Sequence, residues 1–390
     1  MMKVSRTNAT YVWLVFSILL LGCNSASKNN TNTSSTSNTT LSAEHDIAHV
    51  INVLNNDIKD GDYGLIDHFM LVHNGEVLAD FQYQNDYETI AKKYDTTDHQ
   101  YNYNHPDWHP FYKNTDLHTL QSVTKSVTSI LMGIALDNQQ TYTVDTKAMT
   151  FFSEYTLDNK DERLFDMTIE DLLTMRSGLK WVEGEYDDLT DDCIAMEASD
   201  DWIPFVLNKP FDSNPGEKFV YNSGVSVLIG KIVRDITGKK IDAYAEEVLF
   251  GPLGITEYYW KKTPKGEIDT EGGLYLKAQD LAKIGTLFLG EGKWNDKQVV
   301  PKDWVRSSIN PKATNLYPEE SVDVGYGYQW WTERFENGTH FFSANGYGGQ
   351  FLMVVPDENI FVVFNGWNIN DQPEKSTFYV LVNNILPALD

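Results

Sequence analysis

The sequence predicts an α/β fold in which an antiparallel sheet is flanked by helices and interrupted by an all-helical lobe. Three observations carry this prediction. A β-hairpin signal stands near the start of the folded region, helical patterns fill the middle, and strand patterns recur toward the C-terminus. We expect a domain over residues 44–390, with a sheet lobe from about residues 44–115 and 270–390 and a helical lobe from about residues 116–269.

The sheet lobe is predicted to begin with a helix and a hairpin. The helix is indicated by apolar residues at helical spacing: Ile47, Val50, Ile51, Leu54 and Ile58. Two β-type runs, residues 68–73 and 76–83, follow it and are joined by Asn74-Gly75. Asn-Gly between such runs is typical of a two-residue hairpin, because both turn positions need a positive φ.

The middle and end of the chain contain the remaining predicted elements. We expect a helix over residues 165–178, with Thr168 as its N-cap and Gly178 as its terminator. Further helices are predicted over residues 225–236, 241–249, 280–289 and 378–386. Antiparallel strands are predicted over residues 324–331, 339–343, 350–355 and 360–365, with a turn at residues 356–359. The chain shows no internal repeat.

Composition excludes several classes of function. Asp and Glu number 56 against 31 Lys and Arg, a net charge of −25, which argues against binding nucleic acid. The two cysteines form neither a disulfide framework nor a C-x-x-C metal motif. His99, His105 and His109 match no metal-ligand spacing, and the acidic run over residues 183–192 is interpreted as a solvated loop. We therefore expect no metal and no cofactor.

The N-terminus is interpreted as an export signal followed by a tether. Residues 1–22 contain a basic start and an apolar run too short to span a bilayer. The run ends at Leu20-Leu21-Gly22-Cys23, which resembles a bacterial lipoprotein signal whose cysteine is acylated. The alternatives are a failed membrane helix and a plain signal peptide. Residues 23–43 are rich in Asn, Ser and Thr and predict a disordered tether. The resemblance implies a lipid-anchored protein of the cell envelope, on the periplasmic side or at the outer membrane.

Residues 120–136 are the stretch around which we expect the function to be organised. They predict a buried helix with apolar side chains at helical spacing: Val123, Val127, Ile130, Leu131, Ile134 and Ala135. Ser122 would lie in its first turn, where free backbone N–H groups favour negative charge, and Lys125 would share its face. Burial lowers the pKa of an amine, so we expect a neutral Lys125 that accepts the Ser122 proton. The alternative is a surface serine and lysine, because Ser-x-x-Lys alone is a weak motif.

Two later stretches offer groups that would complete such a site. Tyr221 precedes Ser223 on a short connection, and its phenol can pass a proton between Ser122 and a leaving group. Residues 343–350 contain three glycines that permit close backbone approach to a ligand. A strand N–H there, together with that of Ser122, would form an oxyanion hole. The alternatives are a packed loop tyrosine and an ordinary glycine-rich turn.

These stretches together resemble the motif set of a known superfamily. Ser122-Val123-Thr124-Lys125, Leu-Leu-Thr-Met-Arg-Ser-Gly-Leu at residues 172–179, Tyr221-Asn222-Ser223 and the strand at residues 346–350 are similar to those of serine β-lactamases and penicillin-binding proteins. The similarity covers about residues 45–390 and points to the class C branch, which includes esterases and amidases. It implies a β-lactamase/transpeptidase-like fold.

The same resemblance implies roles for individual residues. Ser122 would be the nucleophile, Lys125 the proton acceptor and Tyr221 its partner. The residues implied on the substrate and oxyanion side are Ser223, Asn345, Gly346 and Tyr347, with the oxyanion held by backbone N–H groups of Ser122 and Tyr347.

One departure from the family pattern bears on the substrate. Many β-lactamases have a positive residue where this chain has Ala344, and that residue anchors the substrate carboxylate. Its absence favours an esterase or amidase, and the Gly-Tyr-Gly-Gly-Gln form at residues 346–350 resembles the branch of 6-aminohexanoate-dimer hydrolases. We therefore predict a serine hydrolase acting through an acyl-enzyme on a small ester, amide or peptide-like substrate. The alternative is a catalytically weak lipoprotein that binds penicillin or an envelope polymer.

Overall fold

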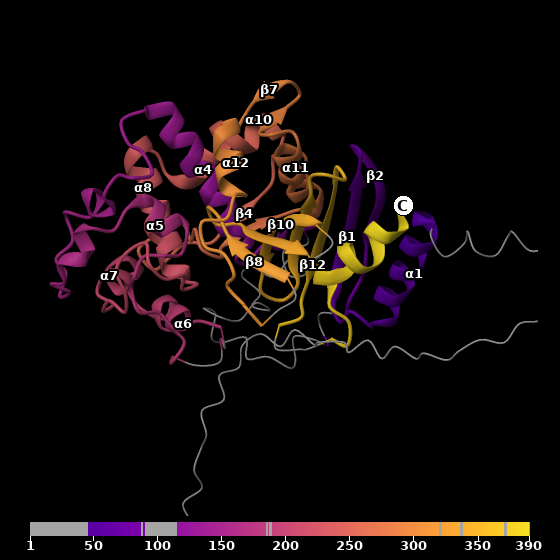
Figure 1. Ribbon diagram of the computed structural model, residues 1–390, viewed down its shortest axis with the longest axis horizontal. Coiled ribbons are helices and arrows are strands. Elements are labelled where there is room, and N and C mark those ends of the chain that lie inside the picture. The colour runs from indigo at the N-terminus through magenta and orange to yellow at the C-terminus, as the bar shows by residue number, and fades with distance from the viewer. Residues whose placement is uncertain are drawn as a thin grey trace, which may run out of the picture. The chain divides into compact units, whose positions relative to one another are not determined.

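The computed structural model describes residues 46–86, 89, 115–184, 186, 189–319, 322–335, 338–369 and 373–389 (Figure 1). The predicted signal segment, Cys23 and the tether lie outside these residues, as do His99, His105 and His109. Within the described residues, none of the helices combines the length and the apolar character that crossing a bilayer requires.

A seven-stranded antiparallel sheet forms the centre of the sheet lobe, in the order β2-β1-β12-β11-β10-β9-β8. Its strands are β1 (Ile66–His73), β2 (Glu76–Gln82), β8 (Val322–Tyr326), β9 (Trp331–Phe335), β10 (His340–Gly346), β11 (Gln350–Val355) and β12 (Ile360–Gly366). The predicted hairpin is confirmed, since Asn74 and Gly75 have φ of 52° and 78° between β1 and β2. The N-terminal hairpin pairs with the C-terminal strand, with Phe69 opposite Phe364.

The sheet buries both faces, because successive side chains on a strand point to opposite sides. Phe69 and Leu71 pack with α1 (Ile47–Asp60) and the C-terminal helical turns (Thr377–Tyr379, Leu381–Ile385 and Leu386–Ala388). Met70 and Val72 pack on the other face, in the larger core shared with α4 (Val123–Gln139) and α11 (Ala278–Leu289). Figure 1 shows α1 and α11 on different sides of the strands.

The other elements lie mostly between β2 and β8 in the chain. Helices other than α1, α4 and α11 are α5 (Ile169–Leu173), α6 (Asp192–Glu197), α7 (Trp202–Leu207), α8 (Ser223–Thr237), α9 (Ile241–Ala245), α10 (Gly251–Leu253) and α12 (Lys302–Ser308). Short helical turns occupy Ala148–Phe151, Glu162–Phe165 and Glu246–Phe250. Two small sheets consist of β3 (His118–Thr119), β5 (Leu274–Leu276) and β4 (Tyr259–Trp260), and of β6 (Lys293–Trp294) and β7 (Lys297–Gln298). The fold class predicted from the sequence is confirmed.

Three predicted elements differ from the structure. The helix expected over residues 165–178 is only α5, because the chain leaves helical geometry at Thr174 and Met175 takes a φ of 57°. Its N-cap is correct, and Thr168 forms a capping box with Asp171. The strand expected over residues 324–331 is divided between β8 and β9 by a turn in which Gln329 has a φ of 62°. The final helix is a series of short turns rather than a regular α-helix.

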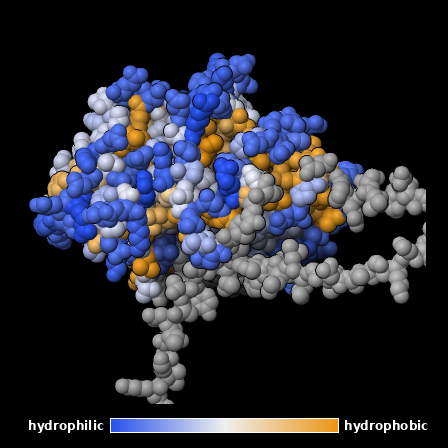
Figure 2. Space-filling model, viewed as in Figure 1, coloured by the Kyte–Doolittle hydropathy of each residue, from blue (hydrophilic) through white to orange (hydrophobic). Residues whose placement is uncertain are grey.

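The surface in view is mostly hydrophilic. Figure 2 shows hydrophilic residues over most of the described face in view, with small hydrophobic patches between them.

Candidate active site

Ser122 lies where a tight turn becomes the first turn of α4. Gln121 has a φ of 48°, and its side-chain amide donates to Thr119 Oγ1 at 2.9 Å, which fixes this strained residue. The N–H of Val123 donates to the Leu120 carbonyl at 3.1 Å. Within the described part of the chain, the Ser122 N–H has no backbone acceptor. The predicted position of Ser122 at the start of a buried helix is confirmed.

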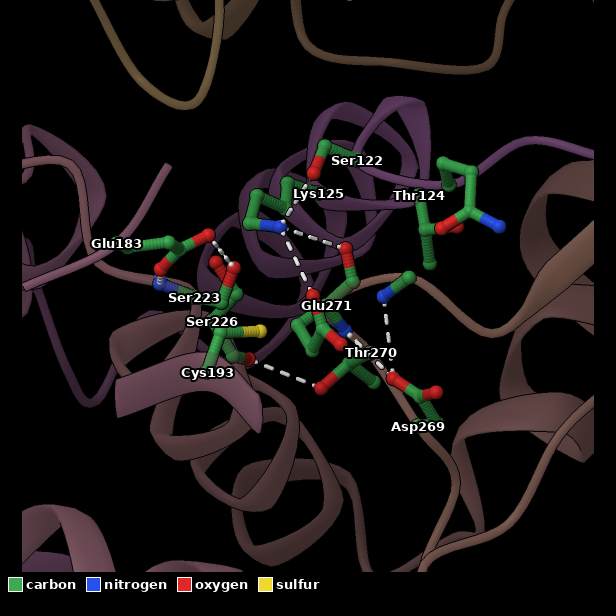
Figure 3. A network of polar contacts seen from close by, with 12 residues as sticks. Ser122, Thr124, Lys125, Glu183, Cys193, Ser223, Ser226, Asp269, Thr270 and Glu271 are labelled. Carbon is green, nitrogen blue, oxygen red and sulfur yellow. Dashed lines mark hydrogen bonds and ion pairs between the residues drawn. The ribbon is translucent and has the colours of Figure 1, made fainter. Parts of the chain in front are cut away.

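Lys125 is one turn further along α4, and its amine is enclosed by the protein. The residue is 1% exposed. Its Nζ donates to Ser122 Oγ at 2.8 Å, to the Glu271 carbonyl at 2.9 Å and to Glu271 Oε2 at 3.0 Å (Figure 3). An ammonium has three N–H groups, so these three acceptors satisfy it completely.

The pKa of Lys125 is shifted by its neighbours as well as by burial. Burial alone lowers the pKa of Lys125, but the Tyr221 and Glu271 groups beside it raise that pKa, and the outcome lies well above the usual value. The shift therefore has the opposite direction to the one that burial alone predicts. Glu271 is 146 positions away in the chain, so the residues around Lys125 in the sequence give no sign of it.

Tyr221 approaches Ser122 from the connection that precedes α8. The Tyr221 ring stacks on Trp331, with centroids 5.8 Å apart and planes at 21°, and Lys125 Nζ lies 5.4 Å from the ring centre. Burial raises the pKa of Tyr221 to about 12, although the neighbouring Lys125 and Ser122 side chains act in the opposite direction. The three side chains expected to meet do meet.

Ser223 lies at the first position of α8, and its polar groups bind a carboxylate that sequence reasoning missed. Its N–H donates to Glu183 Oε2 at 2.8 Å, and its hydroxyl donates to Glu183 Oε1 at 2.6 Å. Glu183 also accepts from Trp181 Nε1 at 2.7 Å and from the Tyr186 hydroxyl at 3.0 Å. Glu183 therefore ties the start of α8 to the segment after α5, and the substrate-facing role of Ser223 stays a prediction.

The interpretation of residues 183–192 as a solvated loop is wrong for several of its carboxylates, Glu183 and Asp191 among them. Glu183 is partly buried and accepts the four bonds just described. Asp191 is 3% exposed and caps α6 by accepting from the N–H groups of Cys193 and Ile194. The charge pattern alone gives no sign of these partners.

The glycine-rich strand end reaches the segment that precedes Ser122. A Cβ at Gly346 would lie 2.3 Å from the Leu120 carbonyl oxygen, so only glycine permits this contact. Tyr347 follows, and its ring lies 5.0 Å from that of Tyr186. The side chain of Asn345 has a buried Oδ1 with no hydrogen-bond partner among the described residues. The roles predicted for Asn345, Gly346 and Tyr347 toward substrate stay predictions.

A buried group of acidic side chains lies behind Lys125. Ligand-type atoms of Cys193, Glu197 and Glu271 all lie within 4.8 Å of one another. Burial raises the pKa of Glu197 well above its usual value, and burial with the Glu271 charge raises that of Asp269 to about 6. Burial also raises the pKa of Glu271, but Lys125 outweighs it, so that pKa falls below the usual value. Glu271 is thus the carboxylate that pairs directly with the catalytic lysine candidate.

The family profile of the beta-lactamases matches residues 76–379. The chain belongs to the beta-lactamase family. It is 24% identical over 303 residues to the 6-aminohexanoate-dimer hydrolase of Paenarthrobacter ureafaciens, covering 70% of this chain and 71% of that protein. It is also 26% identical over 237 residues to an uncharacterized protein of Alkalihalophilus pseudofirmus. That match covers 53% of this chain and 62% of the other protein, which is less than two thirds of its length.

Solved structures share the fold of this chain. The octameric penicillin-binding protein homologue from Pyrococcus abyssi superposes with a TM-score of 0.61 at 19% identity, covering 86% of this chain and 76% of that one. EstCE1, a hydrolase with promiscuous acyltransferase activity, superposes with a TM-score of 0.63 at 12% identity, covering 87% and 97%. The β-lactamase/transpeptidase-like fold inferred from the motifs is confirmed.

Glu183 provides a test of how the site is held together. In Glu183→Ala, the buried Ser223 N–H and Trp181 Nε1 lose their acceptor, which costs about 1–3 kcal/mol for a buried donor. We expect the free energy of unfolding in urea to fall by about that amount. Glu217→Ala is the matched control, because among the described residues Glu217 accepts hydrogen bonds from Asn214 alone, at the exposed surface. Equal stabilities of the two variants would contradict the assignment.

Proposed function

We propose that the protein is a serine hydrolase of the class C type, which cleaves an ester or amide through a covalent acyl-enzyme. The observation that carries the proposal is the arrangement around one hydroxyl. Ser122 Oγ accepts from Lys125 Nζ at 2.8 Å, and the Tyr221 ring lies beside the same amine, 5.4 Å from Nζ to the ring centre. A nucleophile with an amine in direct contact and a phenol close by has the acid–base groups that acyl transfer requires.

In this mechanism, Ser122 Oγ attacks the carbonyl carbon of the substrate and forms a tetrahedral intermediate. The hydroxyl proton passes to Lys125 or Tyr221, whichever is deprotonated, and the same pair then gives a proton to the leaving group. The bond to the leaving group breaks, and Ser122 carries the acyl group. Water hydrolyses the ester formed and releases the acid. Backbone N–H groups of Ser122 and Tyr347 are proposed to hold the oxyanion, next to the Gly346 contact with Leu120.

The proposed substrate is an ester or a linear amide rather than a β-lactam. Ala344 is 2% exposed and packs in the core, so it provides no positive anchor for a carboxylate. The Tyr221 ring stacks on Trp331. The ring of Tyr347, in the glycine-rich motif, packs against that of Tyr186. Aromatic side chains of this kind favour apolar groups on the substrate. Similarity to a 6-aminohexanoate-dimer hydrolase supports a linear amide as one member of this class.

Covalent labelling by a fluorophosphonate probe tests the proposed nucleophile. The probe phosphonylates an activated serine with loss of fluoride, so we expect the wild-type protein to be labelled and Ser122→Ala to be unlabelled. The matched control is Ser129→Ala on the same helix, because the buried Ser129 hydroxyl has no partner among the described residues. Ser129→Ala should retain labelling. Labelling that persists in Ser122→Ala would place the nucleophile elsewhere.

A substrate panel separates this proposal from its alternative. Short-chain esters, linear amides, D-alanyl peptides and nitrocefin are compared with the same preparation. Turnover of esters or amides above nitrocefin supports the proposed class. A stable acyl adduct with nitrocefin and no turnover of the other substrates would instead indicate a penicillin-binding lipoprotein.

We also propose that the chain is exported and lipidated at Cys23, with residues 24–43 as its tether. The basic start, the apolar run and the Leu20-Leu21-Gly22-Cys23 sequence support this. Expression in bacteria with an alkyne-labelled palmitate should yield a labelled wild-type protein and an unlabelled Cys23→Ser variant. Cys193→Ser is the control, because Cys193 is buried and should not be acylated. Label retained in Cys23→Ser would contradict the proposal.

A further inference from the structure

We propose that Glu271 is a positioning residue of this site, which holds the Lys125 amine against Ser122 and binds its charged form. The inference rests on the proposed function and adds a residue to it. Nothing in the sequence motifs includes Glu271, which lies in the segment between β4 and β5.

The first support is the geometry at Nζ. Two of the three acceptors of the Lys125 amine belong to Glu271, the backbone oxygen at 2.9 Å and the carboxylate oxygen at 3.0 Å. The third acceptor is the nucleophile candidate, Ser122 Oγ, at 2.8 Å. Because two contacts with one residue fix the amine, the remaining N–H can point only toward the serine. Glu271 therefore determines both where the amine lies and which way it points (Figure 3).

The second support is that Glu271 is itself held in place. The Thr128 hydroxyl on α4 donates to the Thr270 carbonyl at 2.9 Å, and the Thr270 hydroxyl donates to the Ser226 carbonyl on α8 at 2.9 Å. Asp269 Oδ1 accepts from the Glu271 N–H at 3.1 Å. The segment is thus fastened to α4, which carries Lys125, and to α8, which follows Tyr221. These bonds fix the backbone from which the Glu271 side chain reaches the amine.

The third support is the distribution of charge around the pair. Lys125 faces Glu271, Tyr221, Glu183 and Cys193. Glu271 also faces Glu197 and Lys261. Burial raises the pKa of Glu197 well above its usual value, whereas Lys125 holds the pKa of Glu271 below its usual value. The carboxylate in direct contact with the Lys125 amine is that of Glu271.

The consequence is a pH dependence with a definite sign. The base must lose its proton before it can accept one from Ser122, so the rate of serine modification should rise with pH. A paired carboxylate raises the pKa of an amine by about 1–3 units. The Glu271→Gln substitution keeps the shape of the side chain and an acceptor oxygen but removes its negative charge. The Lys125 amine should therefore lose its proton at a lower pH. The acidic limb of the pH–rate profile should move to lower pH by about 1–3 pH units.

The experiment measures the rate of fluorophosphonate labelling against pH for the full-length protein. Glu197→Gln is the matched control within the cluster, because Glu197 neighbours Glu271 and the substitution keeps the size and shape of its side chain. Glu257→Gln is the control at the surface, where Glu257 pairs with Lys277 at 2.7 Å. Both control variants should show the acidic limb of the labelling rate at the same pH as the wild type. Circular dichroism at each pH confirms that each variant is folded.

The outcomes separate this inference from the proposed function. A wild-type protein that is never labelled contradicts the proposed function itself. The labelling can depend on Ser122 while the acidic limb lies at the same pH in Glu271→Gln as in the wild type. That result overturns only the role of Glu271. The wild-type profile is a second test that needs no variant. It should still rise above neutral pH, and a plateau reached below neutral pH would overturn the inference.

Discussion

The enclosure of one lysine amine is the constraint on which the site depends. An ammonium removed from water loses its hydration, and it is stable only when each N–H finds an acceptor and a negative charge lies close by. Lys125 meets both requirements through Ser122 and Glu271. The same contacts that satisfy the amine place it on the serine hydroxyl, so the arrangement that stabilises the buried charge also prepares the nucleophile.

The fold explains why such distant residues meet. The hairpin of β1 and β2 pairs with β12 and so extends the sheet at that edge. The sheet in turn provides a rigid face for α4. The end of β10 reaches the turn before α4, where Gly346 lets the strand approach Leu120. The connection before α8 brings Tyr221 from the helical region. Each contact uses backbone held by regular structure, which is how a site keeps its geometry before substrate arrives.

The sequence predicts the parts of this account that depend on local spacing. Ser122 and Lys125 are one helical turn apart, and Asn74-Gly75 needs only its own turn geometry, so both are predicted correctly. Tyr221 required a family resemblance, because no local rule links it to α4. Glu271 and Glu183 could not be found, since their partners lie 146 and 40 positions away and acidic residues usually face water. For the same reason, the sequence predicts a lowered pKa for Lys125, whereas its charged neighbours raise that pKa.

A crystal structure of the protein after reaction with a phosphonate ester would test the central claim most directly. The account predicts a covalent bond from phosphorus to Ser122 Oγ, with one phosphoryl oxygen within hydrogen-bond distance of the N–H groups of Ser122 and Tyr347. It also predicts Lys125 Nζ still in contact with Glu271. A phosphonate bound to any other residue, or a phosphoryl oxygen that points away from both N–H groups, would contradict it.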